Sequence, residues 1–238
     1  MPNRQDLRDV LAANPWFRGL PAPLADGILS LGLVRRLDGQ TAYAAGDPPN
    51  GLFALISGEI RIVQTTREGR SALLMIASPG AWFGEAAMID GLPRTSEAVA
   101  VGVAQVLQLT PAVFRRLTGD NAEHYAAFAR LVCEQYRRAM DYIVLTANLP
   151  LAVRLAQRLV GLAHDHGRPG EGGVAIDIRL SQETLAKMVG ASRQSVNGAL
   201  GRMEKRGIVS MGYGALTVRD TAALEAVARS RMLPDFLR

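Results

Sequence analysis

The residues best suited to bind a ligand lie in one short segment that begins at Phe83. The candidate ligand-binding residues of this segment are Phe83, Gly84, Glu85, Ala86, Ala87, Arg94 and Thr95. Glycine at position 84 lets the backbone approach a ligand closely, and the free N–H groups that open the short apolar helix after Glu85 suit an anion. Arg94 can hold a phosphate with its planar guanidinium, and Glu85 can accept a hydrogen bond from a sugar hydroxyl. The segment therefore predicts a site for a cyclic phosphate and its ribose.

Two capped helices separated by a tight turn are predicted further along the chain. Ser181 can cap a helix over Gln182–Val189, and Gly190 lies where the turn needs a positive φ. Ser192 can cap a second helix that runs from Arg193 to about Lys205. This arrangement is typical of a helix-turn-helix that reads DNA.

The second of these helices has a face suited to the major groove. The side chains expected to meet base edges are Arg193, Gln194 and Asn197. Arginine suits a guanine, and glutamine suits an adenine. The side chains better suited to phosphates, which fix the register of the protein on DNA without reading the sequence, are Ser181, Ser192, Ser195, Arg202 and Lys205.

Both segments resemble parts of one protein family. The first resembles the phosphate-binding cassette of cyclic-nucleotide-binding domains, and the string Ser181–Val196 closely resembles the helix-turn-helix of the Crp/Fnr family of bacterial transcription regulators. The resemblance implies a double-stranded β-helix jelly roll, a long helix that forms a homodimer, a double-stranded DNA operator and contact with RNA polymerase. The best-known members carry Arg-Glu near the start of the recognition helix and a second arginine one turn later. Here those positions hold Arg193, Gln194 and Gly198, so we expect a different operator.

The resemblance leaves the base of the nucleotide open. In the family, the long helix offers a threonine and a serine to adenine across the dimer, and the matching residues here are Ala139 and Met140. Thr95 stands where modules that bind cGMP use a hydroxyl toward guanine. We therefore expect a 3′,5′-cyclic nucleotide, either cAMP or cGMP. The alternative is a constitutive or differently liganded DNA-binding dimer in which Glu85 and Arg94 form a buried ion pair.

The elements that would position these residues fall into an α+β fold. Short apolar runs broken by turn residues predict an antiparallel roll over residues 41–109, preceded by short helices within residues 5–31. Residues 1–120 are then the cyclic-nucleotide-binding roll with its N-terminal helices, residues 121–149 the dimerisation helix and hinge, and residues 150–238 the winged helix-turn-helix domain. In the last part we expect a flexible loop over residues 168–173, then a short strand over residues 174–178, a two-stranded wing at residues 208–210 and 215–217, and a short helix in residues 221–238.

A long stretch without Gly or Pro predicts the dimerisation helix. Apolar and small residues recur there at alternating spacings of three and four, at Tyr125, Phe128, Val132, Gln135, Ala139, Tyr142 and Thr146. This pattern predicts a coiled-coil-like seam, or else an amphipathic helix packed on its own roll. Asn148-Leu149-Pro150 ends the helix and predicts the domain hinge.

Charge and composition exclude several classes of protein. Residues 150–238 hold 13 basic and 8 acidic residues, which accounts for the whole net charge of +5 and makes this half the candidate for DNA. The one cysteine, Cys133, excludes a cysteine-ligated iron–sulfur cluster, and the histidines His124, His164 and His166 suggest neither a metal site nor a heme. No long apolar run or signal peptide is present, so we expect a cytoplasmic protein without a membrane span. No nucleophile–base pair or Walker loop indicates an enzyme.

Overall fold

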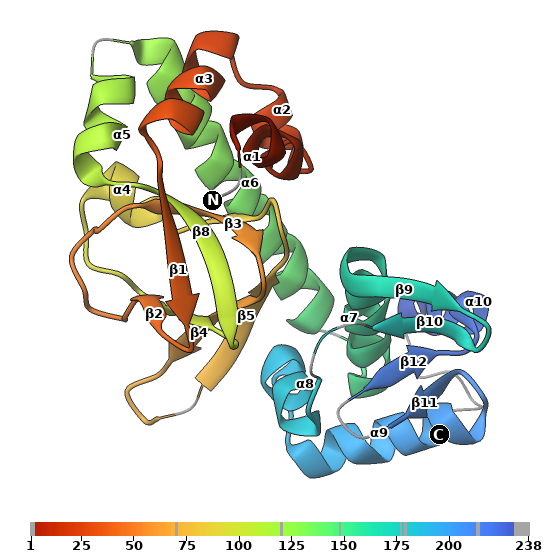
Figure 1. Cartoon of the computed structure of the whole chain (residues 1–238). Helices are drawn as coiled ribbons and strands as arrows, with labels where there is room; N and C mark the ends of the chain where they lie inside the picture. Colours follow the sequence, from red (N-terminus) through yellow and green to blue (C-terminus); the bar gives the residue numbers. More distant parts are fainter. Residues whose placement is uncertain are drawn as a thin grey trace. The chain divides into compact units, whose positions relative to one another are not determined.

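The computed structural model describes residues 3–69, 71–119, 121–147, 149–176, 178, 180–212 and 215–230. The chain forms two compact units, Met1–Arg138 and Ala139–Arg238 (Figure 1). The limit between them falls inside one long helix, α6 (Ala122–Ala147). The division into three domains made from the sequence stays a prediction.

The first unit opens with three short helices, α1 (Arg4–Leu11), α2 (Pro15–Arg18) and α3 (Ala22–Leu31). Asn3 and Asp6 form a capping box at the start of α1, and Asn14 caps α2, whose first residue is Pro15. These helices confirm the breaks expected at the two prolines.

Two antiparallel four-stranded sheets form the roll. The first has the order β1 (Leu33–Asp38), β8 (Val103–Leu109), β3 (Leu52–Ser57) and β6 (Trp82–Phe83), and the second has the order β2 (Thr41–Tyr43), β7 (Glu97–Ala100), β4 (Ile60–Thr65) and β5 (Ser71–Ala77). The inward-facing residues of both sheets form one core, which includes Phe53, Leu55, Ile60, Ala98 and Val106. The expected antiparallel roll is confirmed.

Helices α1, α2, α3, α5 (Pro111–Thr118) and the first half of α6 gather at one end of this roll (Figure 1). An aromatic cluster joins them, with Trp16 packed edge-on against Trp82 and tilted against Phe128. The indole N–H of Trp16 donates to the carbonyl of Ala127 at 2.7 Å. The first half of α6 is therefore part of the core of the roll.

This packing corrects the seam expected along α6. Phe128 is 1% exposed and packs against Phe114, and Gln135 donates to the carbonyl of Trp82 at 3.3 Å, so these two positions face the roll. The exposed apolar side chains lie one residue further on, at Tyr136, Met140 and Ile143, with exposed Cys133 in the same register. The side chains of Tyr142 and Thr146 lie outside the described part. Two neighbouring rows of the helix share the same spacing, and the spacing alone does not tell which row meets the roll.

The second unit is a winged helix-turn-helix domain. Its helices are α7 (Leu151–His166), α8 (Gln182–Val189), α9 (Arg193–Lys205) and α10 (Thr221–Arg229), and its sheet has the order β11 (Val209–Met211), β12 (Leu216–Val218), β10 (Gly173–Ile176) and β9 (Gly167–Gly170). Leu185, Val189, Val196 and Leu200 are buried between the helices. The two helices expected from Ser181 and Ser192 are confirmed with the predicted bounds.

The expected flexible loop over residues 168–173 is wrong. Residues Gly167–Gly170 pair with Gly173–Ile176 as an antiparallel hairpin, in which Pro169 lies opposite Val174. Proline is tolerated there because β9 is the edge strand of the sheet and needs no donor on its outer side. The wing strands lie one residue later than expected, and α10 confirms a short helix after Thr221. Asn148 of the expected hinge, Tyr213 and Gly214 of the expected wing turn, and residues 231–238 lie outside the described part.

Candidate nucleotide site and DNA interface

A tight glycine turn at Gly84 begins the candidate nucleotide site. Gly84 has φ +83°, and a Cβ built on it would lie 2.9 Å from Nη1 of Arg94 and 3.2 Å from Cε1 of Tyr43. Only glycine fits this backbone conformation and this space. Helix α4 (Ala86–Asp90) follows without a side-chain cap and ends at Gly91, which has φ +71°. The first N–H groups of α4 therefore have no partner within the helix.

The guanidinium of Arg94 is buried at this turn and is held by neutral oxygens. The residue is 5% exposed, Nη1 donates to the carbonyl of Gly84 at 2.6 Å, and Nη2 donates to Oδ1 of Asn50 at 2.8 Å and to the carbonyl of Gly51. Its Nε is buried and has no hydrogen-bond partner among the described residues. The described salt bridges include none between Arg94 and Glu85. The cation is therefore bound but not neutralised by a carboxylate.

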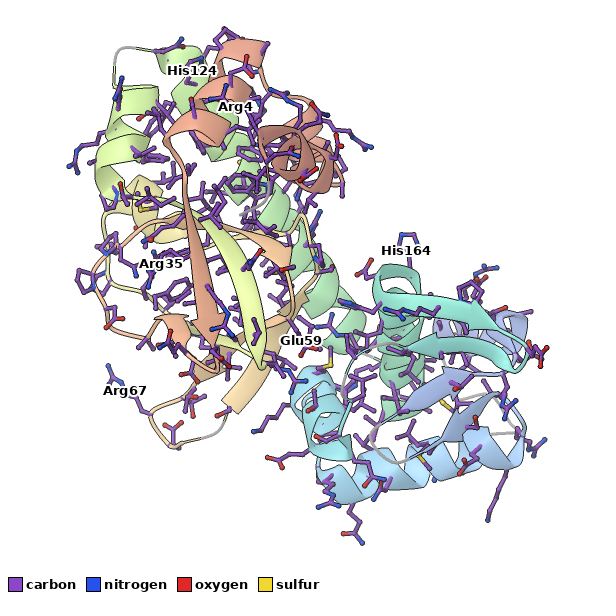
Figure 2. The ribbon with its side chains drawn as sticks, viewed as in Figure 1. Arg4, Arg35, Glu59, Arg67, His124 and His164 are labelled. Carbon is purple, nitrogen blue, oxygen red and sulfur yellow. The ribbon has the colours of Figure 1, made fainter. Side chains whose placement is uncertain are left out.

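Asn50 is itself fixed by two further hydrogen bonds. Its Nδ2 donates to the carbonyl of Ala42 at 2.9 Å, and its own carbonyl accepts from Nε2 of Gln108 at 2.8 Å. Gln108 in turn accepts from the exposed Arg35 of β1 at 3.2 Å, and Figure 2 labels Arg35 beside this strand. The orientation of the Asn50 amide is thus set, with the oxygen toward Arg94.

Burial controls the ionisation of the site. Desolvation raises the pKa of Glu85, and the charge of Arg94 opposes this shift. Desolvation likewise lowers the pKa of Arg94 and raises the pKa of Tyr43 to about 12, so Tyr43 is a neutral phenol. The site therefore favours neutral groups except for the guanidinium, which is too basic to lose its proton.

The structure brings together only some of the expected ligand-binding residues. Gly84, Glu85 and Arg94 meet at the glycine turn, and the sequence analysis missed their partners Tyr43 and Asn50. The remaining expected residues differ in exposure: Phe83 and Ala87 are buried, whereas Ala86, Thr95, Ala139 and Met140 are exposed. Phe83 stacks on Phe53 at 5.5 Å and is a core residue of the roll. An Asn-Gly pair at positions 50 and 51, just before a strand, was the only sequence signal for the missed acceptors.

The candidate DNA interface begins at the capped ends of α8 and α9. The hydroxyl of Ser181 accepts from the N–H of Thr184 at 3.0 Å, and the hydroxyl of Ser192 accepts from the N–H of Ser195 at 3.1 Å. The exposed residues of the expected interface are Ser181, Ser192, Arg193, Gln194, Ser195, Arg202 and Lys205. Asn197 is partly buried, and its Oδ1 has no partner among the described residues. The expected contacts to bases and phosphates stay predictions.

The described residues contain no group of three or more His, Cys, Asp and Glu side chains placed to hold a metal ion. His124 packs its Nδ1 against the carbonyl of Leu117 at 2.8 Å, and His164 points outward from α7 (Figure 2). No described helix combines the length and the apolarity needed to cross a membrane.

Comparisons with known proteins agree with both halves of this architecture. A model of the cyclic nucleotide-binding domain matches residues 34–121, and a model of the Crp-like helix-turn-helix domain matches residues 153–227. The cyclic AMP receptor protein of Thermus thermophilus is 30% identical over 224 residues, which span 92% of this chain and 98% of that protein. A CRP-like cAMP-activated global transcriptional regulator of Mycobacterium tuberculosis is 29% identical over 222 residues, spanning 93% and 99% of the two chains.

A solved structure supports the same assignment. The crystal structure of a CRP-family transcriptional regulator from Thermus thermophilus superimposes with a TM-score of 0.70 at 28% identity, over 82% of this chain and 97% of that one. The roll, the long helix and the winged helix-turn-helix thus agree in sequence and in fold with one group of proteins. The chain belongs to the Crp/Fnr family of transcription regulators, with a cyclic nucleotide-binding domain and a DNA-binding helix-turn-helix domain.

Proposed function

We propose that this chain is a homodimeric transcription regulator whose grip on DNA responds to a 3′,5′-cyclic nucleotide held at Arg94. The observation that carries the proposal is the buried guanidinium of Arg94, which has a free Nε and no carboxylate partner among the described residues. An unneutralised buried cation costs several kcal/mol. The phosphate of a cyclic nucleotide would offset that cost, with Glu85 accepting from the ribose.

The path from the ligand to DNA begins with the strand that precedes Gly84. The carbonyl of Trp82 on this strand accepts from Gln135 of α6, so the turn that would hold the phosphate is joined to the helix proposed to form the dimer. A ligand that favours one position of this turn would favour one arrangement of the paired α6 helices. The two recognition helices would then match half-sites about 34 Å apart on DNA.

Two features bear on which nucleotide is bound. The two curated relatives described above are named for cAMP, which favours cAMP. Thr95 is exposed beside Arg94, and its hydroxyl is free to meet a guanine amino group, which favours cGMP. A regulator bound at a promoter would meet RNA polymerase, and its DNA target would place it in the cytoplasm.

Calorimetric titration of the purified protein with cAMP and with cGMP tests the proposal. We expect saturable heat from at least one nucleotide, together with tighter binding to operator DNA in its presence. Absence of heat from both nucleotides, or equal operator affinity with and without them, would favour a constitutive DNA-binding dimer in which the roll only supports the assembly.

A further inference from the structure

An arginine side chain covers the bare position on the recognition helix. Gly198 of α9 is exposed, and a Cβ built there would lie 3.6 Å from Nη1 of Arg202. This is ordinary van der Waals contact, and no other heavy atom outside the neighbouring helix backbone comes within 4 Å. The guanidinium of Arg202 therefore occupies the space that a side chain at position 198 would take.

Helix geometry explains this placement. Cα–Cβ bonds on a helix tilt toward its N-terminus, so a long side chain covers the turn that precedes its own Cα. The Cα of Arg202 lies ~6 Å further along the helix axis than that of Gly198, and the folded side chain returns its charge to the level of Gly198. Gln194, Gly198 and Arg202 follow one another at four-residue intervals and form one row on the helix surface.

The guanidinium of Arg202 is available to a ligand. Arg202 is exposed, and within the described part of the chain it makes no hydrogen bond or ion pair. By contrast, Lys187 of α8 is paired with Glu183 at 3.1 Å, and Nε of Arg193 approaches Oε1 of Gln182 at 3.4 Å. Glycine at 198 makes the helix less stable than alanine would, and it leaves this row open to the long side chain.

We infer that Arg202 reads a base of the operator, through the space left by Gly198, and does not merely hold a phosphate. The inference rests on the proposed role of α9 as the recognition helix and changes the role that the sequence predicts for Arg202. If Gln194 faces base edges, the head group of Arg202 lies on the same row one turn further along. An arginine in that place suits the O6 and N7 atoms of a guanine.

The test starts from an operator selected out of a random-sequence duplex library by the full-length protein with saturating cAMP, and in a second arm with cGMP. Affinity is then measured for the selected operator and for a random-sequence duplex at several salt concentrations. The variants are Arg202→Ala, Gly198→Leu, Lys205→Ala and Arg193→Ala, each checked for folding by its thermal melt.

We expect Arg202→Ala to weaken operator binding about 10- to 100-fold, with nonspecific binding and the salt slope unchanged. Repeat selection should show relaxed preference at one base pair in each half-site, and Gly198→Leu, which displaces the guanidinium, should relax the same pair. Lys205→Ala should instead weaken binding to all sequences equally and lower the salt slope by about one per contact.

Two results would overturn the inference. One is an Arg202→Ala variant that behaves like Lys205→Ala, with equal loss on both duplexes. The other is an unchanged base preference in Arg202→Ala or in Gly198→Leu. Arg193→Ala separates this failure from failure of the proposed function, because α9 does not read DNA at all if that variant also keeps the full specificity.

Discussion

The guanidinium of Arg94 lies over the ring of Tyr43, with 4.1 Å between its Cζ atom and the ring centroid. The ring also packs against Phe53 at 5.8 Å and Phe83 at 6.3 Å, and Tyr43 is 4% exposed. An aromatic wall on one side and the oxygens of Gly84, Gly51 and Asn50 on the other leave the guanidinium few positions. The cation proposed to hold the phosphate is therefore oriented before any ligand arrives.

Replacement of Tyr43 tests this orientation. Tyr43→Leu removes the ring and the cation–π contact, so we expect a loss of about 2–4 kcal/mol of unfolding free energy and weaker nucleotide binding. Tyr43→Phe keeps the ring and loses only the hydroxyl, which interacts with Ser96, so we expect a loss of about 1 kcal/mol and near-normal affinity. Denaturant unfolding and calorimetry measure both quantities. Equal nucleotide affinity in Tyr43→Leu and Tyr43→Phe would show that the ring does not position Arg94.

A carboxylate in place of the Asn50 amide should silence the site without unfolding the protein. In Asn50→Asp the new charge lies next to Nη2 of Arg94, which donates to Oδ1 of Asn50 at 2.8 Å, and neutralises the guanidinium. We expect nucleotide affinity to fall more than about tenfold, because a charge-assisted bond to the protein replaces the one to the phosphate. The melting temperature should stay at or above that of the unmodified protein.

The matched control for Asn50→Asp is Asn14→Asp. Asn14 caps α2 by accepting from the N–H of Trp16, and a carboxylate is welcome at a helix N-terminus. This variant carries the same change of atoms and charge at a site remote from Arg94, and it should bind the nucleotide normally. Normal affinity in Asn50→Asp would show that Arg94 does not meet the phosphate.

The raised pKa of Glu85 makes a prediction about pH. Because burial holds the pKa of Glu85 above its ordinary value in the folded protein, its contribution to stability is fully present below the pKa of the unfolded chain, about 4, and is lost as the pH rises through the folded pKa. Glu85→Gln removes this loss, so its stability advantage over the unmodified protein should be largest near neutral pH. Denaturant unfolding from pH 4 to pH 8 measures the difference. An advantage that grows toward acid pH would contradict the assigned burial.

How far the sequence predicts this structure depends on how local the signal is. The helices α8 and α9 follow from the caps Ser181 and Ser192 and from Gly190, which lies at φ +62° in the turn between them. The same holds for the turn at Gly84 and for α4. All these signals act within a few residues, so neither the rest of the fold nor the second unit is needed to interpret them.

The partners of Arg94 could not be predicted in this way. Asn50 and Tyr43 lie 44 and 51 residues before Arg94, and only the register of the roll brings them to its guanidinium. The hairpin around Pro169 was missed for a related reason, since its strand pairing depends on being at the edge of a sheet that β10 and β12 complete. Non-local pairing decides these features, and periodicity does not report it.

The exposed row on α6 should form the dimer contact. Ile143→Glu places a charge at the centre of the exposed apolar row, where Ile143 is 52% exposed in the single chain, and should shift the protein from dimer to monomer. Arg138→Glu, on an exposed position of the same helix outside this row, is the control and should stay dimeric. Analytical ultracentrifugation distinguishes the two states. A dimeric Ile143→Glu variant would place the contact elsewhere.

Coupling between the nucleotide and DNA should depend on the hydrogen bond from Gln135 to the carbonyl of Trp82. Gln135→Met keeps the length of the side chain and removes the donor that joins α6 to the strand before Gly84. We expect nucleotide affinity to change little, while the gain in operator affinity on adding nucleotide falls from about 5- to 150-fold toward none. Arg94→Ala is the contrasting variant, because it should lose nucleotide binding itself and keep nonspecific DNA binding. Operator titrations with and without nucleotide, beside calorimetry, separate loss of binding from loss of coupling. A full nucleotide response in Gln135→Met would mean that the signal reaches α6 through the packing of Phe128 and its neighbours and not through this bond.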